Sequence, residues 1–151
     1  MFRGYWENEQ ATHEAMTDNW FHTGDVGYID EEGFLFVVDR IKNLVIRGGE
    51  NIGCGEIEAA IYEHPKVAES IVFGVPDERM GEELAALITR KTECLLTEEE
   101  IRQHLQVHLV ALKIPRYLHI QEEPITRLAS GKFDRKRVRD QFIGRENLTP
   151  S

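Results

Sequence analysis

The chain has 151 residues, of which 41% are hydrophobic and 9% aromatic, and its net charge at neutral pH is −9. This apolar content suffices for one packed core with an appended subdomain, and it excludes a disordered chain. The negative net charge argues against nonspecific binding to nucleic acid or to an anionic membrane.

The sequence favours a soluble, cytoplasmic protein. It contains no apolar run near the roughly 20 residues that cross a bilayer, and its N-terminus lacks the pattern of a secretory signal peptide. Its two cysteines, Cys54 and Cys94, lie outside any CxxC pair. This usage fits a reducing compartment and predicts neither a disulfide framework nor a zinc site.

In the first half of the chain, the first 22 residues show little periodicity of apolar residues. The later apolar residues predict a hairpin with strands at 26–29 and 34–38, a strand at 43–51 that runs into a double-glycine turn, and a helix at 55–64. Pro65 ends that helix because proline cannot continue it.

The second half predicts two strands, a helix, a strand and a final helix. The strands lie at 67–75, 84–91 and 116–121, and the final helix at 134–142. Alternating apolar residues indicate that the first of these strands is half-buried. Thr97, followed by three glutamates, forms a capping box that starts the intervening helix. The pattern predicts an α+β fold: a small three-stranded sheet with flanking helices and a leading β-hairpin.

Charge is unevenly distributed along the chain. Residues 1–38 hold eight acidic side chains and one basic side chain, whereas residues 127–139 hold six basic side chains and one acidic side chain. Such asymmetry usually marks a solvated face. Because the basic cluster follows a glycine-bearing loop, an anionic ligand is the second hypothesis.

Two short motifs have the chemistry of a nucleotide site. Asp25 follows a Thr-Gly pair, and its carboxylate can accept two hydrogen bonds from a vicinal diol such as ribose. Gly48 and Gly49 permit positive φ in a tight turn, and Arg40 can hold a phosphate or a ribose by a forked contact. Taken singly, each motif is more often an ordinary turn with surface charge.

Lys132 follows a Ser-Gly pair and can extend as a flexible point charge towards an oxyanion, although most such lysines are merely solvated. His104 and His108 have the i, i+4 spacing of metal ligands. No carboxylate completes an HExxH pattern, so solvated or packing histidines are favoured and no metal site is predicted. The chain has no GxSxG nucleophile motif and no Walker loop.

The order and spacing of these motifs are far more specific than any one of them. The motif-bearing segments read WFHTGDVGYIDEEGFLFVVDRIKNLVIRGGENIGCGEIEAAIYEHPKVAE, then FGVPDERMGEELAALI, then SGK. Over residues 4 to about 142, the chain resembles the adenylate-forming acyl-CoA synthetase superfamily, which includes firefly luciferase and the adenylation domains of peptide synthetases.

The resemblance implies a two-step reaction. A carboxylic acid joins ATP, in the presence of Mg²⁺, to give an acyl-adenylate and pyrophosphate, and coenzyme A then displaces AMP to give a thioester. It also implies a large N-terminal domain and a small C-terminal α+β domain that rotates between the two steps. Residues 46–65 look most like the fatty-acyl or medium-chain branch.

The resemblance assigns roles by position. Asp25 matches the aspartate that binds the ribose hydroxyls, and Arg40 matches the arginine beside that nucleotide. Lys42 falls at the hinge. Gly48 and Gly49 fall in the loop that lines the pantetheine tunnel of coenzyme A.

Lys132 matches the lysine that contacts the substrate carboxylate and the α-phosphate, where a cation offsets the charge of both reacting anions. The chain also departs from the pattern. Cys54 stands where many members have proline, and Thr126 and Leu128 replace common residues of the loop before Lys132. These departures leave the charged groups in place.

The family's phosphate loop, acyl pocket and magnesium ligand belong upstream of this segment, and about 40 residues are too few to enclose a nucleotide. We therefore expect a C-terminal fragment of a ligase whose main partner is its own N-terminal adenylation domain. Residues 1–41 would be the trailing segment of that domain, 43–143 the mobile domain and 144–151 a frayed tail. The fragment alone is expected to bind no cofactor and to have no ligase activity.

Two alternatives remain open at this point. The charge asymmetry also suits a noncatalytic module that docks on another chain. The superfamily also contains peptide-synthetase adenylation domains and luciferase-like oxidases. No carrier-protein segment follows residue 143, which weighs against the peptide-synthetase alternative.

Overall fold

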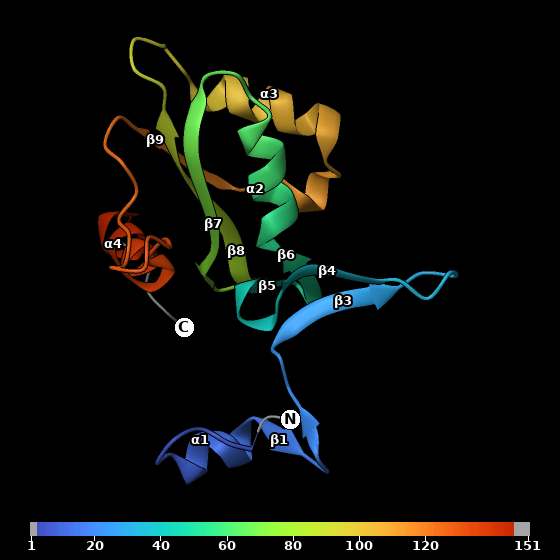
Figure 1. The fold of residues 1–151 in the computed structure, drawn as a ribbon. Coiled ribbons are helices and arrows are strands. Elements are labelled where there is room, and N and C mark those ends of the chain that lie inside the picture. Colours follow the sequence, from blue (N-terminus) through green and yellow to red (C-terminus); the bar gives the residue numbers. More distant parts are fainter. Residues whose placement is uncertain (1–2, 147–151) are drawn as a thin grey trace. The chain divides into compact units, whose positions relative to one another are not determined.

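The structure is a computed structural model that describes residues 3–146. The chain divides after Lys42 into two compact units. In the first unit, Figure 1 shows a short helix followed by two small two-stranded sheets. Its elements are α1 (Glu9–Glu14), β1 (Met16–Thr17), β2 (Trp20–Phe21), β3 (Asp25–Ile29) and β4 (Leu35–Arg40).

Strands β3 and β4 form the predicted leading hairpin, which is confirmed. They pair antiparallel from Asp25 opposite Arg40 to Ile29 opposite Leu35. The turn is held by Asp30, whose Oδ1 accepts the backbone N–H of Glu32 at 3.0 Å and of Phe34 at 2.8 Å. An aspartate that bonds the backbone beyond it is a common turn former.

The second unit contains a sheet with helices on both sides. The 3₁₀ turn η1 (Ile41–Asn43) spans the boundary between the units. The following elements are β5 (Leu44–Arg47), β6 (Glu50–Gly53), α2 (Cys54–Tyr62), β7 (Val67–Asp77), β8 (Gly81–Arg90), α3 (Glu98–His108), η2 (Ala111–Lys113), β9 (Tyr117–Gln121) and α4 (Arg135–Glu146).

The α+β class is confirmed, but the sheet of the second unit has five strands, not the three predicted. Its order is β6-β5-β8-β7, and β9 lies parallel to β8. The difference arises at residues 43–51, which form two strands around the double-glycine turn. β5 joins the sheet through the pairing of Arg47 with Gly81 in β8.

The sheet has an apolar core on each face. Helices α2 and α3 cover one face, and α4 covers the other (Figure 1). Ile71 and Val72 are successive residues of β7, so they point to opposite faces, yet both are fully buried. The prediction of a half-buried strand at 67–75 is therefore wrong, because α2 and α3 cover the face of Val72, which was expected to meet solvent.

The helix ends follow local signals. Thr97 Oγ1 accepts the Glu100 N–H at 3.2 Å, and Glu100 Oε2 accepts the Thr97 N–H at 2.9 Å, so the predicted capping box is confirmed. Helix α4 continues to Glu146, beyond the predicted end, and the rest of the expected frayed tail, 147–151, lies outside the described residues. Across residues 3–146, no helix combines the length and apolar character needed to cross a membrane.

Candidate functional site

The first unit brings two of the predicted site residues together. Asp25 begins β3 and Arg40 ends β4, and the register of the hairpin places them opposite each other. Arg40 Nε donates to Asp25 Oδ1 at 2.8 Å. The Asp25 N–H donates to Thr23 Oγ1 at 3.1 Å, and the Ile41 N–H donates to the Gly24 carbonyl at 2.8 Å. The loop before Asp25 is thereby hydrogen-bonded to the start of β3 and to the residue after β4, both at the open end of the hairpin.

This arrangement has the chemistry of a diol site beside a cation. The Asp25 side chain is 28% exposed and that of Arg40 is 54% exposed, so both reach solvent. A carboxylate offers about four acceptor positions, and the ion pair occupies one of them.

Lys42 lies in η1 at the last position of the first unit. Its side chain is exposed. The resemblance implies a hinge at this residue, and the chain divides into two compact units directly after it.

Gly48 and Gly49 form the two-residue turn between β5 and β6. Their φ values are +58° and +90°, as a type I′ hairpin turn requires. The Gly48 N–H donates to the Met80 carbonyl at 2.8 Å, and a Cβ on Gly48 would lie 2.7 Å from Met80 Cε. A Cβ on Gly49 would meet nothing within 4 Å, so this turn presents its Gly49 side openly.

Lys132 lies on the loop between β9 and α4, and its side chain is exposed. The loop closes on itself, because the Leu128 N–H donates to the Lys132 carbonyl at 2.8 Å and the Gly131 N–H donates to the Leu128 carbonyl at 2.9 Å. The φ angle of Gly131 is +81°, a conformation that favours glycine because it has no Cβ. The lysine is therefore mounted on a structured turn.

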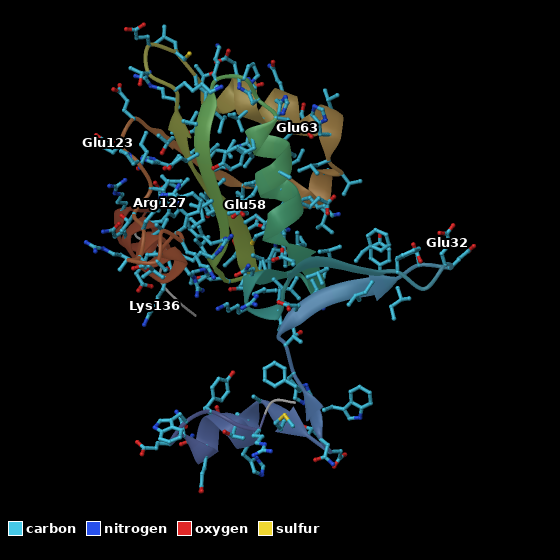
Figure 2. All side chains as sticks on the ribbon, viewed as in Figure 1. Glu32, Glu58, Glu63, Glu123, Arg127 and Lys136 are labelled. Atoms are coloured by element: carbon cyan, nitrogen blue, oxygen red, sulfur yellow. The ribbon has the colours of Figure 1, made fainter. Side chains whose placement is uncertain are left out.

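Arg127 anchors this loop to the sheet, a role that the sequence reasoning missed. Its guanidinium donates to Glu69 Oε1 at 2.6 Å and to the Gly131 carbonyl at 2.8 Å. It also lies over the Phe133 ring, 4.2 Å from the centroid. Figure 2 shows Arg127 beside the sheet. Glu69 lies 58 residues from Arg127 in the sequence, whereas Gly131 lies only four residues away. Only the contact with Gly131 could therefore have been recognised from a local sequence pattern.

The ion pair with Arg127 also affects Glu69. Burial raises the pKa of its carboxyl, but the hydrogen bonds from Arg127 and from the Ile125 amide outweigh burial, and the pKa lies below its usual value. The Ile125 N–H is 2.8 Å from Glu69 Oε2. Glu69 is therefore an anion that holds both ends of the segment 125–127.

The basic run around Lys132 divides into paired and unpaired cations. Arg135 pairs with Glu58 at 2.8 Å and donates to the Val72 carbonyl at 2.7 Å, and Arg139 meets Glu82 at 3.4 Å. These arginines fasten α4 to the sheet and to α2. Within residues 3–146, the Lys132 ammonium has no ion pair or hydrogen bond.

In the second unit, the two site loops meet β7 near opposite ends. The Lys132 loop is anchored at Glu69, whereas the Gly48–Gly49 turn contacts Met80, just beyond the end of β7 at Asp77. From Glu69 to Asp77 the strand advances about 26 Å at roughly 3.3 Å per residue. The two loops thus belong to separate surfaces of one unit.

Comparison with known proteins gives a family match and several relatives. The model of the AMP-binding enzyme C-terminal domain matches residues 56–132. The 2-succinylbenzoate–CoA ligase of Geobacillus sp. (strain WCH70) is 41% identical over 145 residues, which cover 96% of this chain and 29% of that relative.

Two solved structures have the same fold. The ATP-bound structure of MatB from Rhodopseudomonas palustris matches with a TM-score of 0.83 at 33% identity. The o-succinylbenzoate CoA synthetase of Bacillus subtilis, in complex with the acyl-adenylate intermediate OSB-AMP, matches with a TM-score of 0.82 at 34% identity. Each match covers 93% of this chain and 28% of the solved chain.

The chain therefore spans less than a third of the length of these relatives, and the matched segment runs from α2 to the Lys132 loop. The chain belongs to the AMP-binding enzyme C-terminal domain family and corresponds to the C-terminal part of an adenylate-forming enzyme.

Proposed function

We propose that this chain is the C-terminal part of an ATP-dependent, AMP-forming acid–thiol ligase. The whole protein would activate a carboxylic acid as acyl-adenylate and then transfer the acyl group to coenzyme A. The observation that carries the proposal is the exposed Lys132, which has no ion pair in the described part of the chain and lies on a loop that Arg127 holds in place.

Lys132 is proposed to act in the first step. An ammonium that has no ion pair within residues 3–146 is available to a bound anion, and its position on an anchored turn limits the freedom lost when it docks. Between a substrate carboxylate and an α-phosphate, it would offset charge on both reacting groups. Arg127 would be a positioning residue, because its contacts are to the loop and not to substrate.

Asp25 and Arg40 are proposed to bind the nucleotide. The Asp25 carboxylate would accept the two ribose hydroxyls, while Arg40 holds that carboxylate in place and lies beside the phosphates. The 2.8 Å ion pair between them supports this assignment, since it orients the acceptor before the nucleotide arrives.

The separation of the two loops supports a rotation between the two steps. The Lys132 loop is anchored near one end of β7 and the Gly48–Gly49 turn lies near the other, so we expect that one bound adenylate would not meet both in a single arrangement. Rotation about Lys42 would bring first the Lys132 loop and then the Gly48–Gly49 turn to the bound substrates. The open space at Gly49 suits the passage of a pantetheine chain.

Residues 1–42 support the proposal of an N-terminal adenylation domain as partner. The β3–β4 hairpin exposes apolar side chains on both of its faces. They are Tyr28, Ile29, Phe34, Leu35, Phe36, Val37 and Val38. A two-stranded hairpin is marginal by itself, and exposed apolar patches of this kind are normally covered by protein. The remainder of a domain would cover it.

ATP, Mg²⁺, a carboxylic acid and coenzyme A are the proposed substrates and cofactor of the whole ligase. No residue of this chain is assigned to Mg²⁺. For the acid, we propose a fatty acid on the resemblance of residues 46–65 to that branch. The relatives include a 2-succinylbenzoate–CoA ligase, so a panel of fatty and aromatic acids, tested with the whole protein, separates these substrate classes.

A chimera tests the role of Lys132. The chain would replace the matching C-terminal part of the B. subtilis o-succinylbenzoate CoA synthetase, whose fold it shares. In an active chimera, Lys132→Ala should abolish most formation of OSB-AMP from ATP. It should largely spare thioester formation from preformed OSB-AMP. Lys136 on α4 is the matched control, since it is also an exposed lysine of the basic run (Figure 2).

Normal rates of both steps in the Lys132→Ala chimera would contradict the assignment. The purified 151-residue chain should give no ATP–pyrophosphate exchange, and measurable exchange would refute its proposed inactivity. Tight binding to an unrelated protein, together with a chimera that never becomes active, would favour the noncatalytic docking module.

A further inference from the structure

We propose that Glu63, His104 and His108 form a binding site for a divalent transition metal of the zinc class, which clips α2 to α3. The sequence offered the two histidines at i, i+4 without a carboxylate. The fold supplies the carboxylate from a different helix: Glu63 is the C-cap of α2, and Figure 2 shows it beside α3.

The three side chains converge. One ligand atom from each lies within 4.8 Å of the other two. Glu63 Oε2 is 3.6 Å from His108 Nδ1, and the rings of His104 and His108 are 4.5 Å apart at their centroids. A distance of 3.6 Å is too long for a hydrogen bond, so these groups face one another without a direct bond.

One ring nitrogen of His104 is held by the backbone of α2. Its Nε2 lies 2.9 Å from the Ala60 carbonyl oxygen. Because a carbonyl can only accept, Nε2 carries the proton, and the neutral ring keeps its lone pair on Nδ1. Metal-bound histidines usually donate their second N–H to such a partner, which fixes the ring and its tautomer. The His64 ring packs edge-on against His104 at 5.1 Å and further restricts it.

The donor set indicates the class of cation. Two imidazoles and one carboxylate suit Zn²⁺ and its neighbours rather than Ca²⁺ or Mg²⁺, which prefer oxygen ligands. Ligand atoms around tetrahedral Zn²⁺ stand about 3.4 Å apart, so the widest separation, 4.8 Å, must close by roughly 1.4 Å. Glu63 and His108 are exposed and can rotate, and solvent can supply the fourth ligand.

The test is Co²⁺ titration of the tag-free 151-residue chain, followed by Zn²⁺ competition. We expect one visible d–d absorption band that saturates at one equivalent and is displaced by Zn²⁺. Glu63→Gln and His108→Asn should each weaken binding about tenfold or more, because even outer-shell changes cost 10–100-fold. His13→Asn and Cys94→Ser, outside the cluster, should leave binding unchanged.

Thermal melts give a second readout. A metal that binds only the folded chain raises its melting temperature, so the same Zn²⁺ concentration should stabilise the unsubstituted chain more than the Glu63→Gln variant. Melts without metal verify that each variant is folded, and both replaced side chains are exposed. Absence of the band at millimolar Co²⁺, or equal binding by the Glu63→Gln and His108→Asn variants, would overturn the proposal.

Discussion

Replacement of Arg127 by methionine should loosen the loop that carries Lys132 while leaving the sheet intact. Methionine keeps an apolar stem of similar length, but it removes the ion pair with Glu69, the hydrogen bond to the Gly131 carbonyl and the contact with the Phe133 ring. The Arg127 side chain is 44% exposed, so each contribution is that of a partly solvated group.

The expected magnitude follows from these three contacts. A partly exposed ion pair contributes about 0.5 kcal/mol, the charged hydrogen bond about 1.5 kcal/mol at the low end of its range, and the cation–π contact about 0.5 kcal/mol. Allowing for the retained stem, the free energy of local opening should fall by about 2 kcal/mol, a factor of about thirty in the opening equilibrium.

Native-state hydrogen exchange measures this opening. The amides of Leu128 and Gly131, which bond within the loop, should lose protection about thirtyfold, whereas amides paired between β7 and β8 should not. Arg137→Met is the matched control. The Arg137 guanidinium has no ion pair or hydrogen bond within the described part of the chain.

Acid provides an independent check on the same contact. The pKa of Glu69 is lowered in the folded chain, so its contribution is complete above the unfolded pKa and is lost as the pH falls through the folded pKa. Protection at Leu128 should therefore decline on acidification, and decline less in Arg127→Met. Unchanged protection in a folded Arg127→Met variant would refute the view that Arg127 anchors the loop.

Three further predictions follow from other parts of the chain. In the active chimera, Lys42→Pro should slow thioester formation more than adenylate formation, because proline fixes φ at the proposed hinge; equal slowing of both steps would argue against the hinge. Thr97→Ala should lower the free energy of unfolding by about 1 kcal/mol, measured by urea denaturation, and an unchanged midpoint would mean that the capping box contributes nothing. Hydrogen bonds from Lys66 and from the Thr97 amide lower the pKa of Glu100 from 4.5 to about 2. The stabilisation from this carboxylate is therefore complete above pH 4.5 and is lost as the pH falls towards 2, so Glu100→Gln should flatten the dependence of the urea midpoint on pH over that range.

Sequence reasoning succeeded where the relevant contacts are local. The capping box at Thr97 joins residues three apart, and the turn at Asp30 joins residues two and four apart. Both can be read from a short window because the bonded groups are neighbours in the chain. The Gly48–Gly49 turn was recognised for the same reason, although the number of strands that it joins was not.

Sequence reasoning failed where a distant segment decides the environment. The alternation at 67–75 correctly indicated a strand, but its second face, that of Val72, is covered by α2 and by α3, which lies beyond β8 in the chain. The anchoring of Lys132 through Arg127 and Glu69 spans 58 residues. No local pattern encodes the pairing of Arg127 with Glu69, since each of these charged side chains is equally compatible with full exposure to solvent.

The sequence by itself determined the α+β class, the positions of the helices, the membership of the adenylate-forming family and the candidate residues from Asp25 to Lys132. Those properties depend on local periodicity and on motif order. Only the tertiary structure decided which charges are paired. It joins Asp25 to Arg40, leaves Lys132 without a partner in the described residues, and places Glu63 beside two histidines. Pairing is a matter of distance in space, and folding brings those groups together only when the helices pack on the sheet.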